Sequence, residues 1–127
     1  MEKKLKILAV DDDFINLKLI HSMLKRNANV GSVIEAGNGL DALTILNQDK
    51  DIHMVLLDIK MPIMDGIEFL TNMQSQASLK NIPVVVLTTD ETKKHEAFDN
   101  GAYDFLVKPI RENELSEKIN KVAELIF

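Results

Sequence analysis

The sequence is 127 residues long, enough for one domain with its own hydrophobic core, and we expect that domain to span residues 1–127. Its 46% hydrophobic and 28% charged residues exclude an intrinsically disordered chain. The net charge of −5 argues against direct nucleic-acid binding, and the lack of cysteine excludes disulfides and thiolate metal sites.

Five short apolar runs alternate along the chain with longer segments of helical periodicity. The expected strands are 5–10, 32–36, 53–58, 83–88 and 103–108. The expected helices are 14–27, 39–49, 66–77, 91–100 and 112–126. Strict alternation of strands and helices predicts an α/β fold, a doubly wound parallel sheet with helices on both faces. Five such units are typical of the flavodoxin-like (βα)5 fold, with strand order 2-1-3-4-5.

Two of the expected helices differ sharply in how much apolar surface they offer. The last helix carries an apolar stripe formed by Leu115, Ile119, Val122, Ala123 and Ile126. The fourth, DETKKHEAFDN, has only two obviously apolar residues, Ala97 and Phe98. We therefore expect the fourth helix to be the least buried and the most mobile.

No apolar run reaches membrane-spanning length, and the N-terminal run that faintly resembles a signal peptide is interrupted at Asp11. We therefore expect no membrane association.

Polar residues stand where four of the expected strands end. Asp11 and Asp12 follow the first strand, and Asp58, Thr88 and Lys108 end the third, fourth and fifth. The carboxyl ends of parallel strands meet at one edge of the sheet, so these side chains should share a pocket. Three carboxylates and one lysine leave a negative charge that a hard divalent cation such as Mg²⁺ would balance. An aspartate beside such an ion can act as a nucleophile toward phosphorus.

Four motifs in this order resemble those of the receiver domain of two-component response regulators, and the resemblance covers essentially the whole chain. They are VDDD (10–13), LLDIKMPIMDG (56–66), VVLTT (85–89) and FLVKP (105–109). Any one of them would be a weak signal alone, but together they are specific.

The resemblance implies a Mg²⁺ site and a phosphoacceptor. Asp58 would be the phosphoacceptor, and Asp11 and Asp12 would hold Mg²⁺ together with it. The backbone carbonyl of Lys60 would be a further metal ligand, and Mn²⁺ or Ca²⁺ would be able to replace Mg²⁺. Asp13 is expected to cap the first helix or to face water.

The same resemblance implies a group of residues that respond to phosphorylation. The hydroxyl of Thr88 and the ammonium group of Lys108 would bind phosphoryl oxygens, and Phe105 would be the aromatic switch residue. The Lys108–Pro109 peptide bond is expected to be cis. Phosphorylation would change the surface formed by the fourth helix, the fifth strand and the fifth helix.

The family further implies a phosphodonor partner, a histidine kinase or a histidine phosphotransfer protein, and a cytoplasmic location. A monomer or a weak phosphorylation-dependent dimer is expected. The catalytic activity would be limited to the chain's own phosphorylation and dephosphorylation. Two alternatives for output remain open, a regulator with one domain or a receiver taken from a larger protein.

Three residues near the expected site are candidates for modulating its rates. Thr89 is larger than the very small residue usual at this position of the family, and we expect it to slow the exchange of phosphodonors or water. Lys60 and Asp90 follow Asp58 and Thr88 by two residues and carry opposite charges, so they could form an ion pair across the site.

Other protein classes fit the sequence less well. A haloacid-dehalogenase-like phosphohydrolase would use Asp11 as nucleophile and Asp13 as acid. However, Ile15 stands where that class usually has threonine or valine, and the chain has no cap-sized insertion. A flavin or nucleotide binder of this fold would need a phosphate-binding loop after the first strand, where three aspartates would repel phosphate. A receiver that only docks to a partner would not need all of these site residues.

Overall fold

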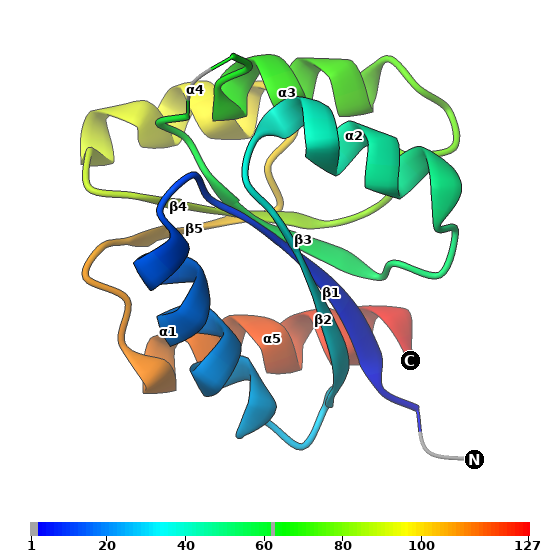
Figure 1. The fold of residues 1–127 in the computed structure, drawn as a ribbon, viewed down its shortest axis with the longest axis vertical. Coiled ribbons are helices and arrows are strands. Elements are labelled where there is room, and N and C mark those ends of the chain that lie inside the picture. The colour runs from blue at the N-terminus through cyan, green and yellow to red at the C-terminus, as the bar shows by residue number, and fades with distance from the viewer. Residues whose placement is uncertain (1–2, 62) are drawn as a thin grey trace.

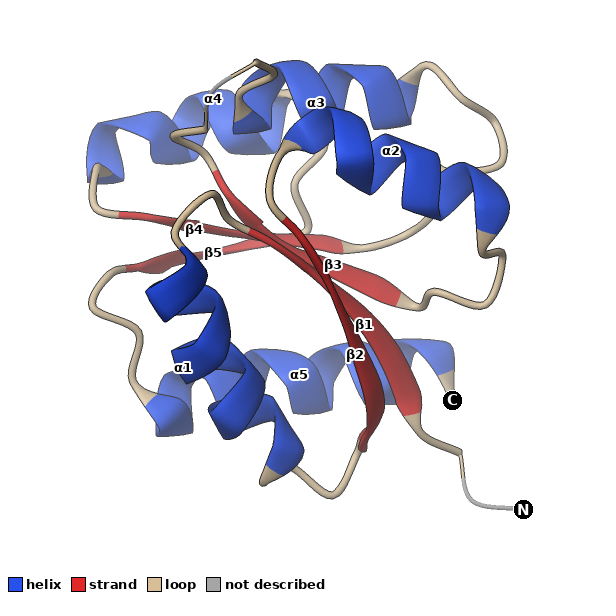
Figure 2. Ribbon diagram, viewed as in Figure 1, coloured by secondary structure: helices blue, strands red, loops and turns tan. Residues whose placement is uncertain are grey.

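The computed structural model describes residues 3–61 and 63–127, in which a five-stranded parallel sheet lies between two layers of helices (Figures 1 and 2). The strands are β1 (Leu5–Val10), β2 (Val30–Ala36), β3 (Met54–Asp58), β4 (Val84–Thr88) and β5 (Asp104–Val107). The helices are α1 (Phe14–Lys25), α2 (Gly39–Gln48), α3 (Gly66–Gln74), α4 (Lys94–Asp99) and α5 (Glu112–Ile126), and a 3-10 turn, η1 (Glu91–Lys93), precedes α4. The strand order β2-β1-β3-β4-β5 confirms the predicted flavodoxin-like topology. Pro62, within the motif LLDIKMPIMDG, lies outside the described residues.

The two helix layers cover opposite faces of the sheet because successive strand residues point to opposite sides. In β1, Ile7 and Ala9 belong to an apolar cluster with residues of α1 and α5. Leu8 and Val10 belong to a second cluster with residues of α2, α3 and α4. Both faces of the strand are thus buried, which explains its nearly continuous apolar sequence.

Most element bounds agree with the sequence analysis, and the differences have local causes. α3 ends at Gln74 rather than at residue 77, because the backbone N–H of Gln76 bonds to the carbonyl of Met73, three residues back, and the four-residue helical ladder does not continue. β2 begins earlier than expected, because Val30 pairs with Leu5 and the register then skips one residue.

The fourth helix is the least buried, as predicted, and it is also divided. The Asp90 side chain accepts a hydrogen bond from the backbone N–H of Thr92, which starts the 3-10 turn η1 before α4. Ala97 is the only buried residue of α4, and Phe98 is 40% exposed. No helix among the described residues is long and apolar enough to cross a membrane.

Candidate functional site

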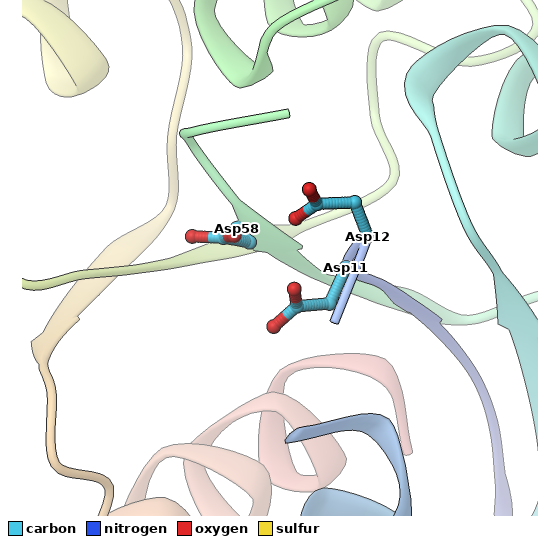
Figure 3. A group of neighbouring side chains, drawn as sticks. All are labelled: Asp11, Asp12 and Asp58. Carbon is cyan, nitrogen blue, oxygen red and sulfur yellow. The ribbon is translucent and has the colours of Figure 1, made fainter. Parts of the chain in front are cut away.

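The ends of β1 and β3 bring two buried aspartates together. Asp11 and Asp58 each follow directly on paired residues, Val10 of β1 and Leu57 of β3. Asp11 continues the side of β1 that faces α1 and α5, and Asp58 continues the same side of β3. Both carboxylates therefore converge at the sheet edge although 47 residues separate them in sequence (Figure 3).

The third member of the carboxylate cluster is Asp12, whose side chain is exposed. One oxygen each of Asp11, Asp12 and Asp58 lies within 4.8 Å of the others. Asp13 is not part of this cluster, because its carboxylate accepts a hydrogen bond from the backbone N–H of Ile15 at 2.9 Å and caps α1. Asp13 is itself held in place by its own backbone N–H, which donates to Asp11 Oδ1 at 2.9 Å.

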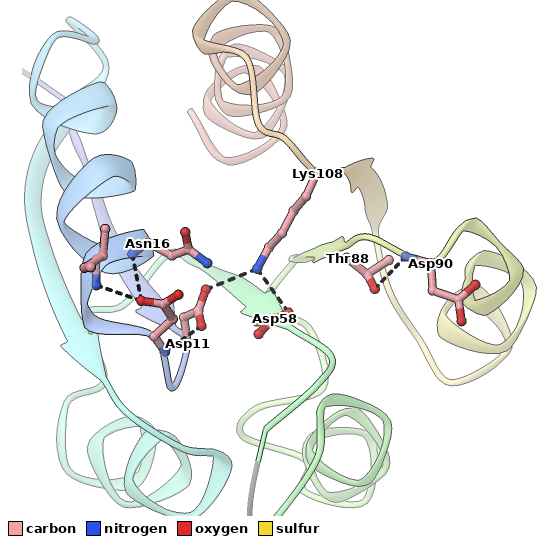
Figure 4. Close-up of polar contacts among 8 residues, drawn as sticks. Asp11, Asn16, Asp58, Thr88, Asp90 and Lys108 are labelled. Carbon is pink, nitrogen blue, oxygen red and sulfur yellow. Dashed lines mark hydrogen bonds and ion pairs between the residues drawn. The ribbon is translucent and has the colours of Figure 1, made fainter.

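Lys108 completes the charged centre from β5. Its Nζ lies 3.4 Å from Asp11 Oδ2 and 3.4 Å from Asp58 Oδ1, as the dashed lines in Figure 4 show. Its backbone N–H donates to the carbonyl of Thr88 at 2.8 Å, which fixes the end of β5 against β4. The Lys108–Pro109 peptide bond is cis, as predicted.

The cluster is electrostatically strained without a cation. Burial and, next, the negative charge of Asp11 raise the pKa of Asp58 to about 6, while Lys108 partly opposes that rise. Asp58 is only 7% exposed and Asp11 only 1%, so water screens their repulsion poorly. One lysine does not neutralise three carboxylates, and a divalent cation fits the remaining charge and the oxygen donors.

Thr88 and Phe105 lie on the other side of the sheet edge. Val86 of β4 and Phe105 of β5 pair with each other and share the core cluster that contains α2, α3 and α4 residues. Thr88 continues the same side of β4, is 1% exposed, and accepts a hydrogen bond at Oγ1 from the Asp90 backbone N–H at 3.2 Å (Figure 4). Among the described residues the Thr88 hydroxyl donates to no acceptor, so its proton can be donated to a ligand.

The three expected modulating residues are placed differently from one another. Thr89 is exposed and lines a groove with Lys108. Lys60 is exposed and lines another groove with Asp12. No ion pair joins Lys60 and Asp90 among the residues that the structure describes, so their pairing stays a prediction. Asp90 caps η1, and its hydrogen bonds with Thr92 hold its pKa below the usual range, with smaller contributions from the positive charges of Lys93 and Lys60.

The sequence analysis did not single out Asn16, whose side chain reaches the site from the first turn of α1 (Figure 4). Its position four residues after Asp12, on the helix that follows the acidic loop, is the signal that was available.

Comparison with known proteins decides the family. The family model of the response regulator receiver domain matches residues 7–120. The chain belongs to this family. It is a receiver domain of two-component response regulators, a class of signalling domain. This membership disfavours the haloacid-dehalogenase alternative, as does the helix-capping position of Asp13.

The receiver domain is similar to proteins of comparable length. It is 35% identical over 126 residues to chemotaxis protein CheY-3 of Vibrio cholerae, covering 98% of this chain and 95% of that protein. It is 33% identical over 118 residues to the two-component response regulator ORR3 of Oryza sativa, covering 91% of this chain and 88% of that protein.

Solved structures confirm the fold. The chemotaxis response regulator CheY4 of Vibrio cholerae superposes with a TM-score of 0.85 at 30% identity, over 94% of this chain and 98% of that one. The receiver domain of a sensor histidine kinase from Pseudomonas aeruginosa superposes with a TM-score of 0.84 at 22% identity, over 95% of this chain and 98% of that one. That second structure holds a magnesium ion in its active-site cleft, and its likeness to this chain shows the fold alone.

Proposed function

We propose that this receiver domain accepts a phosphoryl group on Asp58 in a Mg²⁺-dependent reaction. The observation that carries the proposal is the convergence of Asp58 with Asp11, Asp12 and Lys108 at the carboxyl edge of the sheet. A carboxylate oxygen of Asp58 attacks phosphorus, and the bond from phosphorus to the donor breaks. With a phosphohistidine donor, the electron pair of that bond returns to the imidazole nitrogen, which then takes up a proton.

The residues that would hold Mg²⁺ are Asp11, Asp12 and Asp58, with the backbone carbonyl of Lys60. Oxygen donors at this spacing suit a hard cation, and Mn²⁺ or Ca²⁺ would occupy the same ligands. Bound Mg²⁺ supplies positive charge that stabilises the transferring phosphoryl oxygens and lowers the repulsion between the carboxylates.

Lys108 and Thr88 bind the phosphoryl group in this proposal. The Lys108 ammonium already lies at Asp58 and would pair with a phosphoryl oxygen, while the Thr88 hydroxyl would donate to another. Thr88 and Phe105 occupy the same side of neighbouring strands, so a movement of Thr88 toward the phosphoryl group changes the space next to Phe105. The change then alters the surface formed by α4, β5 and α5. Few side chains of α4 are buried, so this helix can shift at low energetic cost.

The partner that supplies the phosphoryl group would be a histidine kinase or a histidine phosphotransfer protein, as befits a two-component receiver. Residues 1–127 form one functional unit in this proposal, with the cytoplasmic location usual for the family. The unit would be a monomer or a weak dimer after phosphorylation.

Labelling with acetyl phosphate and Mg²⁺, read by intact-protein mass spectrometry, tests the acceptor. The wild-type chain should gain one phosphoryl group, and Asp58→Asn should gain none because it lacks the nucleophile. Asp13→Asn is the matched control, since asparagine also caps helices and Asp13 lies outside the cluster. Labelling should be lost in EDTA. Stoichiometric labelling of Asp58→Asn would overturn the assignment.

A further inference from the structure

The side chain of Asn16 differs from the other half-buried asparagines of the chain. Six asparagines are half-buried in the described residues, and five of them donate a hydrogen bond within the chain through the side-chain amide. These five are Asn27, Asn29, Asn38, Asn72 and Asn100. The Asn16 side chain has no hydrogen-bond partner among the residues that the structure describes, where only its backbone N–H is bonded. A half-buried amide without a partner is available for a ligand.

The position of Asn16 is fixed relative to the charged cluster. Its backbone N–H lies 3.4 Å from the carboxylate of Asp13, whose own N–H donates to Asp11 Oδ1. Asn16 lines a groove of about 430 Å³ together with Thr89 and Lys108. Figure 4 shows its amide group on the α1 side of the site, directed toward Lys108. The groove thus places a polar group that has no partner in residues 3–61 and 63–127 beside the lysine that contacts Asp58.

Phosphoryl transfer puts two groups in line with the phosphorus atom. One is the acceptor oxygen of Asp58, and the other is the leaving group of the donor during phosphorylation. During hydrolysis of the aspartyl phosphate, the attacking water takes the place of that leaving group. A residue that binds this outer position therefore acts on both reactions.

We propose that Asn16 is a catalytic residue of this receiver domain, one that hydrogen-bonds the group in line with Asp58 through its side-chain amide. The inference rests on the proposed phosphoacceptor function. The amide N–H donates to the leaving oxygen of an acyl phosphate during phosphorylation. During hydrolysis the amide oxygen accepts from the attacking water and holds it toward phosphorus. Water adds to phosphorus, the bond to the Asp58 oxygen breaks, and the water proton is released to solvent with inorganic phosphate.

The test compares Asn16→Ala and Asn16→Leu with the wild-type chain. Phosphorylation by acetyl phosphate and loss of the phosphoryl group after donor removal are followed by mass spectrometry, and Mg²⁺ affinity is followed by calorimetry. One lost hydrogen bond should slow both reactions by about threefold to tenfold. The Mg²⁺ dissociation constant should change by less than about twofold, because Asn16 is not among the metal-cluster residues. Asn16→Gln, which keeps the amide, should recover part of both rates.

Leu19→Ala is the matched control, since Leu19 lines the same groove on α1 with an apolar side chain. Its hydrolysis rate should equal that of the wild type. The proposal is overturned if Asn16→Ala and Asn16→Leu leave both rates within about 1.5-fold of the wild type, or if the rates fall only in proportion to Mg²⁺ affinity. Failure of the proposed function is a separate outcome, in which the wild-type chain itself gains no phosphoryl group.

Discussion

Replacing Asp58 with asparagine should stabilise the metal-free fold. Burial and the neighbouring charge of Asp11 raise the pKa of Asp58 from 3.8 to about 6. Each pKa unit corresponds to about 1.4 kcal/mol, so ionising Asp58 in the folded chain costs on the order of 3 kcal/mol at neutral pH. Asparagine is nearly isosteric and carries no charge, so Asp58→Asn removes that cost. The residue central to the proposed function is thus predicted to weaken the fold.

The sign of the pH dependence follows from the raised pKa. Protonated Asp58 is favoured in the folded state relative to the unfolded state. The stabilisation of the fold by this protonation is fully present below pH 3.8 and is lost as the pH rises through about 6. The free energy of unfolding of Asp58→Asn should exceed that of the wild type by about 3 kcal/mol at pH 7.5 and by about 1 kcal/mol at pH 4.5.

Urea denaturation in EDTA, followed by circular dichroism at both pH values, measures this difference. Asp51→Asn is the control, since Asp51 is exposed and lies outside the metal cluster, and its stability should match the wild type. Adding Mg²⁺ should stabilise the wild type and narrow the gap to Asp58→Asn, because the cation binds the folded carboxylates. Equal stabilities of wild type and Asp58→Asn at pH 7.5 in EDTA, or a difference that does not change with pH, would refute the reasoning.

Three further predictions concern residues in the segments around Asp58. Thr89→Ala should speed both labelling by acetyl phosphate and loss of the phosphoryl group, because Thr89 lines the groove at the site; unchanged rates would contradict a gating role. Ile63 has a φ of 70° and is 76% exposed, so Ile63→Asn should raise the free energy of unfolding in urea by about 1 kcal/mol, whereas a loss of stability would count against backbone strain there. A Cβ at Gly66 would lie 2.6 Å from Ile59 Cα and 2.9 Å from the Asp58 carbonyl oxygen. Gly66→Ala should therefore lower the free energy of unfolding by roughly 1–3 kcal/mol and slow labelling, and wild-type values in both measurements would show that the start of α3 adjusts freely.

The sequence by itself determined the architecture and the residues of the charged cluster. Apolar strands buried on both faces have a distinctive pattern, and parallel strands with helical connections must place Asp11, Asp58 and Lys108 at one edge. The role of Asp13 as a helix cap was also predictable, because capping depends on neighbours in the chain.

Tertiary structure alone decided which neighbours those residues meet. The alternation along each strand sends Asp11, Asp58 and Lys108 toward α1 and α5, and sends Thr88 and Phe105 toward the other layer. This division depends on strand register, which is set by packing between elements far apart in the sequence.

The tertiary structure also decided which partners the polar residues near the site contact. Lys60 and Asp90 have suitable charges for an ion pair, but the sequence did not reveal that Asp90 is also held by hydrogen bonds with Thr92 at the start of η1. The spacing of Asn16 from Asp12 was a weak signal in the sequence, and only the folded chain reveals that its side-chain amide lies beside Lys108 without a partner among the described residues. Charge and spacing in the sequence identify the groups that are able to react, whereas tertiary packing determines which of them already have hydrogen-bond partners and which remain available to a ligand.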